Sequence, residues 1–266
     1  MRPFPCCLAL LLLICTAACI PNPPEPVSTP SLPPVRDLPP NCEERGEVHV
    51  ACSSEAGFNY WLSLPTAETL SEAGIFTGQP LPLLVYLHGF SHSGEDLKQV
   101  LNGGVAAEIE RGRELPLIAV SPQCPSGPTW AAPSSLERLS AFVAEMITTY
   151  NTDPNRVYLT GCSMGGDGAW ALGIAHPEQF AAVVPLASWH LDPRGVCALR
   201  DVPVWIFQSE RDEVVAPRFA ERMTAALEAC PGNVKTTWYE NASHDATSGL
   251  AYHEDELYDW MLKQSR

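Results

Sequence analysis

Seven short runs of apolar residues alternate with helix-like runs, and this alternation constrains the fold more than any other feature of the sequence. The short runs are almost continuously hydrophobic and rich in β-branched and aromatic residues, which favours strands buried on both faces. The helix-like runs have apolar residues at helical spacing. We expect strands at residues 58–64, 81–89, 115–122, 156–161, 181–187, 202–208 and 234–240, and helices at 134–150, 168–176 and 217–230.

This order of elements predicts an α/β protein with a mostly parallel sheet that is covered by helices on both faces. The chain has 266 residues, of which 45% are hydrophobic, enough for one substantial core. We therefore expect one folded domain over residues 42–266. Ligands of such sheets bind at the carboxyl ends of the strands, so functional residues are expected directly after strands.

Residues 1–18 are typical of an export signal. They contain one positive charge, then an apolar run shorter than the roughly 20 residues that a membrane span needs, then small residues. Residues 16–19, TAAC, resemble a bacterial lipobox, in which Cys19 becomes the lipidated first residue of the mature protein, although Thr16 stands where an aliphatic residue is more usual. The alternative is ordinary cleavage after Ala18 without a lipid.

Residues 19–41 are predicted to be a linker. Nine prolines between residues 20 and 40 predict an extended, semi-rigid spacer of about 3.1 Å per residue, and the alternative is a leader without a spacing role. We expect a protein of the bacterial cell envelope, a lipoprotein if Cys19 is lipidated and secreted or periplasmic if it is not. The formal charge of −15 disfavours nucleic acid and anionic membrane surfaces as partners, so a lipid anchor is the only membrane contact expected.

The cysteines agree with export. Six lie in the expected domain, where an oxidising compartment would allow disulfides. A bond between Cys42 and Cys52 would close a hairpin and is the strongest pairing, and Cys197 with Cys230 is a weaker one. The sequence contains no CxxC pair and no Cys/His cluster with zinc spacing, so we expect no metal and no cofactor.

The stretch GCSMG at residues 161–165 fits the pattern GxSxG between an expected strand and an expected helix. In that setting the pattern predicts a sharp elbow, whose glycines remove Cβ atoms that would clash while Ser163 is held exposed in a strained conformation. The alternative is a tight turn without a catalytic role. Cys162 is a rival nucleophile, but the pattern centred on it would need glycine at Thr160, so Ser163 is favoured and Cys162 is expected to be a buried free thiol.

A serine nucleophile needs a base, and the base needs an orienting acid. In this fold class the chain order is serine, acid, histidine. Asp212 follows one expected strand and His244 follows the next, so both are expected at the same edge of the sheet as Ser163. Glu210 is the alternative acid and His253 the alternative base.

Two backbone N–H groups are expected to form the oxyanion hole. One belongs to Met164 at the start of the helix, and the other belongs to Phe90 in the turn after the strand at 81–89. His88 in the same turn is expected to hold the loop in place rather than to take part in the chemistry.

These motifs together resemble the α/β-hydrolase superfamily. The resemblance lies in PLLVYLHGFSHSGED, AVSPQCP, DPNRVYLTGCSMGGDGAWALGIAHPEQFAAVVPLAS and VPVWIFQSERDEVV, and it covers about residues 58–262. The chain is most similar to the exported esterases and predicted peptidases of the superfamily, the group related to polyhydroxybutyrate depolymerases and feruloyl esterases. Carried over residue by residue, the resemblance implies Ser163, Asp212 and His244 as the triad and Phe90 with Met164 as the oxyanion donors.

The sequence departs from the family pattern at residues 186–190, LASWH, where small glycine-rich residues are more usual. Trp189 and His190 are therefore expected to shape the substrate pocket. Trp130 and Trp189 each follow an expected strand, and flat aromatic walls would suit a phenolic acyl group or a sugar ring. The alternative is that both tryptophans pack loops onto the core.

The expected function is hydrolysis of a carboxylic ester through an acyl-enzyme, on a short-chain or aromatic ester that is a small molecule or part of a polymer. Only 48 residues separate Ser163 from Asp212 and 31 separate Asp212 from His244, which leaves no room for a large cap domain. A peptidase of the same fold and a non-catalytic binding module are the alternatives. Peptidases of the superfamily usually carry a large extra domain, and amide hydrolysis needs protonation of the amine that leaves, so the ester is favoured.

Overall fold

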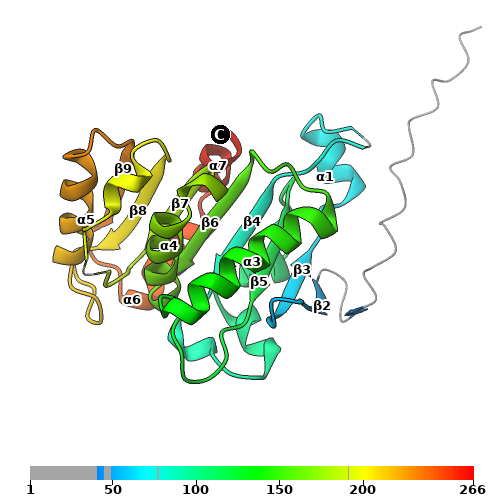
Figure 1. Cartoon of the computed structure of the whole chain (residues 1–266), viewed down its shortest axis with the longest axis horizontal. Helices are drawn as coiled ribbons and strands as arrows, with labels where there is room; N and C mark the ends of the chain where they lie inside the picture. Colours follow the sequence, from blue (N-terminus) through cyan, green and yellow to red (C-terminus); the bar gives the residue numbers. More distant parts are fainter. Residues whose placement is uncertain (1–40, 45–48, 77, 191) are drawn as a thin grey trace, which may run out of the picture. The chain divides into compact units, whose positions relative to one another are not determined.

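The computed structural model describes residues 41–44, 49–76, 78–190 and 192–266, and these form a nine-stranded sheet with helices on both faces (Figure 1). The predictions for the signal sequence, for Cys19 and for linker residues 19–40 lie outside the described residues. The strands are β1 (Cys42–Glu44), β2 (His49–Ser53), β3 (Asn59–Ser63), β4 (Leu83–Leu87), β5 (Ile118–Pro122), β6 (Val157–Cys162), β7 (Ala182–Leu186), β8 (Val204–Ser209) and β9 (Val234–Tyr239).

The helices connect the strands. The α-helices are α1 (Ala67–Glu72), α2 (Gly104–Glu110), α3 (Pro133–Tyr150), α4 (Met164–Ala175), α5 (Arg218–Glu228), α6 (His244–His253) and α7 (Asp255–Leu262). Short 3-10 turns are η1 (Phe90–His92), η2 (Leu97–Asn102), η3 (Pro177–Gln179) and η4 (Val196–Leu199). No described helix is both long enough and apolar enough to cross a membrane.

The strands follow the order β1-β2-β3-β5-β4-β6-β7-β8-β9. β1, β2 and β3 pair in antiparallel fashion, β3 is antiparallel to β5, and the strands from β5 to β9 are parallel neighbours. The predicted α/β fold and all seven predicted strands are confirmed. β1 and β2 form the hairpin that was expected around Cys42 and Cys52, but they were not among the seven predicted strands, because β1 has three residues and β2 is only partly buried.

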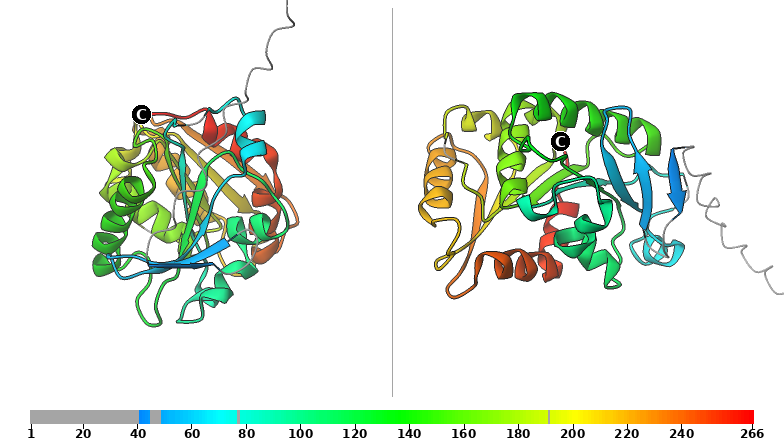
Figure 2. Two further views of the ribbon diagram at one scale, coloured as in Figure 1. Left: turned by 90° about the vertical axis from the view of Figure 1, so that its right-hand side faces the viewer. Right: turned by 90° about the horizontal axis from the view of Figure 1, so that it is seen from below.

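Each face of the sheet carries its own core. Along β4, Leu83, Val85 and Leu87 pack into one core and Leu84 and Tyr86 into the other, as the alternation of side chains along a strand requires. Residues of α3, α4 and α5 belong to the first core, and residues of α2, α6 and α7 belong to the second. The left view of Figure 2 shows these two helical layers on opposite sides of the sheet.

Two disulfides join the pairs that the sequence favoured, and both predictions are confirmed. Cys42–Cys52 links the paired strands β1 and β2, and Cys197–Cys230 links η4 to the residue that follows the C-cap of α5. Cys124 and Cys162 are free and buried in the described part of the chain.

The carboxyl ends of the parallel strands meet at one edge of the sheet. Phe90 lies in the connection after β4, and Ser163 directly follows β6. Asp212 lies in the loop after β8, and His244 is the first residue of α6, which follows β9. The described connections at this edge consist of short helices and loops, without a large cap domain. The three predicted helices are also present. α4 begins at Met164, as the oxyanion argument expected, which is four residues before the helix-like run at 168–176; the first turn is rich in glycine and so lacks the apolar pattern of that run.

Candidate active site

Ser163 occupies a sharp turn between β6 and α4. Its φ of 58° and ψ of −122° lie in a region that side chains rarely adopt, and it is the N-cap residue of α4. Its backbone N–H donates to the carbonyl of Leu186 at 2.9 Å, which fixes the turn to the neighbouring strand.

The glycines around Ser163 are required by close backbone contacts. A Cβ on Gly165 would overlap the carbonyl oxygen of Leu87, and a Cβ on Gly161 would overlap the carbonyl group of Gly165. Both obstacles are backbone atoms, which cannot rotate away. These contacts are the physical reason for the GxSxG spacing that the sequence shows.

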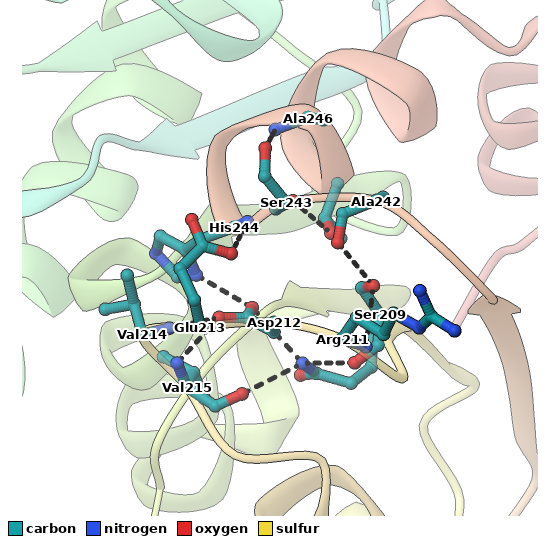
Figure 3. Close-up of polar contacts among 12 residues, drawn as sticks. Ser209, Arg211, Asp212, Glu213, Val214, Val215, Ala242, Ser243, His244 and Ala246 are labelled. Carbon is teal, nitrogen blue, oxygen red and sulfur yellow. Dashed lines mark hydrogen bonds and ion pairs between the residues drawn. The ribbon is translucent and has the colours of Figure 1, made fainter.

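Asp212 and His244 form a buried pair at the ends of β8 and β9. The Nδ1 of His244 lies 2.8 Å from Oδ2 of Asp212 (Figure 3). The other carboxylate oxygen, Oδ1, accepts hydrogen bonds from the backbone N–H groups of Val214 at 2.9 Å and Val215 at 2.6 Å. The side chain of Gln208 also donates to Oδ2, at 3.2 Å. The carboxylate is thus held on both oxygens and presents one of them to the imidazole.

The imidazole of His244 is oriented by this pair. Because Nδ1 faces a carboxylate, Nδ1 carries the proton and Nε2 is left as the basic nitrogen. Nε2 is buried and has no hydrogen-bond partner among the described residues. The position of His244 is fixed by Ser243, the N-cap of α6, and by its own N–H, which donates to the carboxylate of Glu213 at 3.1 Å.

The structure does not favour the alternative catalytic groups Glu210, His253 and Cys162. Glu210 is exposed, and the carboxylate that meets His244 belongs to Asp212. His253 lies at the other end of α6, where its Nδ1 lies 3.1 Å from the carboxylate of Glu108. Burial raises the pKa of the Cys162 thiol to about 12, so this thiol remains protonated at neutral pH.

The turn after β4 lies beside Ser163. A Cβ on Gly89 would be 3.7 Å from the Cβ of Ser163, so this turn and the elbow are in contact. Phe90 is the first residue of η1 and Met164 is the first residue of α4. Neither backbone N–H donates a hydrogen bond within the described ranges, as expected for the first residues of helical turns.

His88 holds this turn in place, as predicted. Its Nε2 accepts the N–H of Cys124 at 2.9 Å, so Nδ1 is the protonated nitrogen and donates to the carbonyl of Gly89 at 2.7 Å. Burial lowers the pKa of His88 to about 4, so the ring is neutral at neutral pH. A neutral ring with both nitrogens bonded to the protein fixes the loop and has no role in proton transfer.

A cavity of about 550 Å³ connects these groups. Ser163, His244 and Phe90 all line it, together with residues of α2 and α6. The cavity is therefore shared by Ser163, His244 and the expected oxyanion turn.

The predicted substrate-binding residues do not line this cavity. Trp130 is fully buried, and its Nε1 donates to the carbonyl of His88 at 3.0 Å, so the prediction that Trp130 forms a pocket wall is wrong: the ring supports the oxyanion turn from inside the core. Trp189 is partly buried against the first core. The Nδ1 of His190 lies 2.7 Å from Oδ1 of Asp167. Contacts of Trp189 and His190 with substrate stay predictions.

The cavity wall formed by α2 and α6 was not predicted. His92, two residues after Phe90, also lines the cavity, and burial lowers the pKa of its imidazole. Because His92 lies only two residues after Phe90, the sequence alone could have indicated that it lies near the site. Neither the pairing of α2 with α6 nor the support of Asp212 by Gln208 has a comparable local signal. Among the described residues no group of three or more His, Cys, Asp or Glu side chains is arranged to hold a metal ion.

Comparisons with known proteins agree with the fold. The sequence model of the dienelactone hydrolase family matches residues 130–255, a range that includes Ser163, Asp212 and His244. The crystal structure of a thermostable esterase has 26% sequence identity to the chain and a TM-score of 0.69. That similarity covers 82% of this chain and 63% of the esterase, so the chain spans less than two thirds of the esterase's length.

Two further solved structures share the fold at lower identity. S-formylglutathione hydrolase from Staphylococcus aureus is 15% identical with a TM-score of 0.61, over 81% of this chain and 98% of that one. Acylaminoacyl peptidase from Pyrococcus horikoshii is 12% identical with a TM-score of 0.59, over 85% of this chain and 42% of that one. No match to the chain was found among curated proteins. By the order of its strands and its elbow at Ser163 the chain has the α/β-hydrolase fold, and it is similar to esterases and peptidases of that superfamily.

Proposed function

We propose that the protein hydrolyses carboxylic esters, with Ser163 as the nucleophile, His244 as the general base and Asp212 as the orienting acid. One observation carries the proposal: His244 is bonded through Nδ1 to Asp212, while its Nε2 has no partner among the described residues and the ring lines the same cavity as Ser163. An imidazole whose Nδ1 is held by a carboxylate and whose Nε2 has no hydrogen-bond partner is suited to remove the proton of a serine in the same cavity.

In the first half of the reaction the Oγ of Ser163 attacks the ester carbonyl carbon. The proton of Oγ passes to Nε2 of His244, and the imidazolium that forms is stabilised by the Asp212 carboxylate. The tetrahedral intermediate then collapses, the bond from carbon to the alcohol oxygen breaks, and His244 returns the proton to that oxygen. The alcohol leaves and the acyl group remains on Ser163.

In the second half water replaces the alcohol. His244 removes a proton from water, and the resulting hydroxide adds to the acyl carbon. Collapse of the second intermediate breaks the bond to Oγ of Ser163, which recovers its proton from His244. The products are the carboxylic acid and the alcohol, and the enzyme returns to its starting state.

The backbone N–H groups of Phe90 and Met164 are the proposed oxyanion donors. Both begin helical turns beside Ser163, and neither has another partner in the described part of the chain. Loss of one such donor typically raises the barrier by about 2.7–4 kcal/mol. His88 and Trp130 would maintain the geometry of this hole, because they fix Gly89 and the carbonyl of His88 itself.

Ester hydrolysis is favoured over peptide hydrolysis. The described connections around the site are short, so the cavity lacks a screening domain inserted between the strands. An alkoxide also leaves more readily than an amine, whose departure requires proton transfer from His244 in good alignment. Similarity to acylaminoacyl peptidase keeps peptide amides as the second candidate substrate, although it covers less than half of that protein.

The test uses 4-nitrophenyl acetate and a fluorophosphonate probe with the purified protein. The wild-type protein should hydrolyse the ester and react with the probe, and Ser163→Ala should lose both, with a fall in kcat of several decades. Ester hydrolysis that persists in Ser163→Ala would contradict the proposal. Peptide amide cleavage with a kcat/KM comparable to that of the best ester, also lost in Ser163→Ala, would favour the peptidase instead.

A further inference from the structure

The cavity extends away from Ser163 along a groove between α2 and α6. On α6 its lining residues are Asp245, Ser248, Gly249 and Tyr252, which share one face of the helix at spacings of three and four residues. On the opposite side it is lined by Gly104, Glu108 and Arg111, again at spacings of four and three residues. The groove is therefore bounded by the facing sides of two helices.

The floor and the far end of the groove are also defined. Tyr86 and Tyr252 both line it, and their rings meet edge to face with centroids 5.6 Å apart. At the far end Arg111 donates to the carboxylate of Glu108 at 2.8 Å, so the two charges at this end compensate each other. The groove has an aromatic floor, and at its far end the charge of Arg111 is paired with that of Glu108.

Gly249 is the unusual residue of this groove. It lies inside α6, where glycine is the poorest helix former after proline. Its backbone does not have a positive φ, and a Cβ placed on it would have no atom within 4 Å. Neither conformation nor close packing therefore requires glycine at this position. What glycine does at this position is leave the wall of the groove without a side chain.

We propose that this groove is the binding site for one arm of the ester, and that Gly249 keeps it wide enough for that arm. The inference rests on the proposed ester hydrolysis and names the class of substrate: an ester whose acyl or alcohol part is a linear or flat aromatic arm without a negative charge. Arg111 lies seven positions after Gly104, so the α2 wall is about 10 Å long at 1.5 Å per residue. At about 1.2 Å per bond along an extended chain, this length holds an arm of roughly eight atoms.

The charges of the groove disfavour an anionic arm. Asp245 stands at the end nearest to His244 and makes no ion pair within the described ranges, and this carboxylate would repel an anionic arm. Arg111 is already paired with Glu108 at the other end. An arm longer than the groove would have to displace this ion pair or turn out into solvent, which sets an upper limit on length.

The test compares Gly249→Leu with the wild-type protein on two series of esters. In one, the acyl chain of 4-nitrophenyl esters is lengthened from acetate to dodecanoate; in the other, the alcohol of acetate esters is lengthened from ethyl to dodecyl. The wild-type kcat/KM should rise with length to about eight atoms in one of the two series and fall beyond. In Gly249→Leu the ratio of kcat/KM for the eight-atom arm to that for the shortest ester should fall at least tenfold.

Two further variants distinguish an effect on the groove from an effect on the stability of α6. Ala246→Leu adds the same side chain to an exposed position of α6 that does not line the cavity, so it should keep the wild-type ratio. Gly249→Ala should lower the ratio less than Gly249→Leu. Thermal unfolding of both Gly249 variants should occur at the wild-type temperature or above, because both residues favour the helix more than glycine does.

An unchanged ratio in Gly249→Leu, for both series, would overturn the proposal, and so would an equal fall for short and long esters. A wild-type protein that cleaves no ester at all would instead refute the proposed function, because the groove test reads only the dependence on length. Failure of the groove proposal alone would leave hydrolysis of the acetate ester and its loss in Ser163→Ala intact.

Discussion

At the scale of single residues, the account depends on how Asp212 is held. Its two carboxylate oxygens receive hydrogen bonds from two backbone N–H groups and from Gln208, and one of these oxygens faces His244. This arrangement fixes which nitrogen of the imidazole is basic. A neutral amide at position 212 would keep the size of the side chain but would permit the wrong tautomer of His244.

We therefore expect Asp212→Asn to lower kcat by about four decades on 4-nitrophenyl acetate, with little change in folding. The matched control is Glu210→Gln, which removes the exposed carboxylate two residues earlier and should stay within about twofold of wild type. The reverse result, a large loss for Glu210→Gln and a small one for Asp212→Asn, would transfer the role of the acid to Glu210. Steady-state kinetics of the two variants decide the matter.

His88 is the second residue whose chemistry has a measurable consequence. The pKa of this buried imidazole is lowered to about 4, whereas an unfolded chain has a histidine pKa of about 6.5. Between pH 6.5 and 4 the imidazole therefore binds a proton in the unfolded state but not in the folded state. The stabilisation of the folded state by this group is fully present above pH 6.5 and is lost as the pH falls toward 4. Between pH 7.5 and 5 this single group should remove about 2 kcal/mol of the free energy of unfolding.

The prediction is checked by urea unfolding of the wild-type protein and of His88→Asn at pH 7.5 and pH 5. Wild type should lose about 2 kcal/mol more than the variant between these two values. His49 and His92, whose imidazoles also have a lowered pKa, remain in both proteins and cancel in the comparison. Equal losses in the two proteins would show that His88 is not the buried neutral group described above.

At the scale of elements, the elbow between β6 and α4 shows what a local pattern can and cannot predict. GxSxG predicted the turn, because its glycines are required by contacts with neighbouring backbone. The strands of the centre were predicted because they are continuously apolar, and β4 to β8 are buried along their whole length. The turn after β4 was expected beside Ser163 and lies there, and its role as an oxyanion hole stays a prediction.

What the sequence did not reveal depends on contacts between distant segments. Trp130 looked like a residue of the site because it follows β5, but its ring is directed into the core, where it bonds the carbonyl of His88. The groove between α2 and α6 is formed by segments that lie about 140 residues apart in the chain. No local pattern of polar and apolar residues specifies such a wall, so it appears only in the three-dimensional arrangement.

The elbow also gives a prediction about stability. Gly165→Ala should destabilise the protein by about 1–3 kcal/mol or more, because the new methyl group overlaps the carbonyl oxygen of Leu87 and backbone must move. Gly249→Ala makes the same change in a helix with no neighbouring atom and should instead stabilise by about 0.5–1 kcal/mol. Thermal unfolding of the two variants measures both, and equal signs would contradict the close approach at the elbow.

At the scale of the whole molecule, the two disulfides are compatible with an exported protein. The first described residue, Asn41, precedes β1, and the register from β1 through β2 and β3 to β5 places the start of β1 at the edge of the sheet that carries Ser163. Asn41 therefore lies at the edge of the sheet that carries the candidate active site.

We propose that the protein is exported and that Cys19 carries a lipid. If so, full-length protein expressed in a bacterium should partition with membranes or detergent, and Cys19→Ala should move it to the soluble fraction and change its processing. Ester hydrolysis should be the same in both forms, which shows that the domain is intact. Wild-type protein found only in the soluble secreted fraction, with an unmodified Cys19, would refute the anchor.

The central claim is that the acyl group of the substrate is transferred to Ser163. The most direct measurement is peptide mapping by mass spectrometry of protein mixed with 4-nitrophenyl acetate and quenched in acid within milliseconds. We predict one acetyl group per chain on Oγ of Ser163, and its absence in Ser163→Ala and in His244→Ala. An acetyl group on the neighbouring Cys162 instead of Ser163, or one that still forms in Ser163→Ala together with hydrolysis of the ester, would contradict the mechanism.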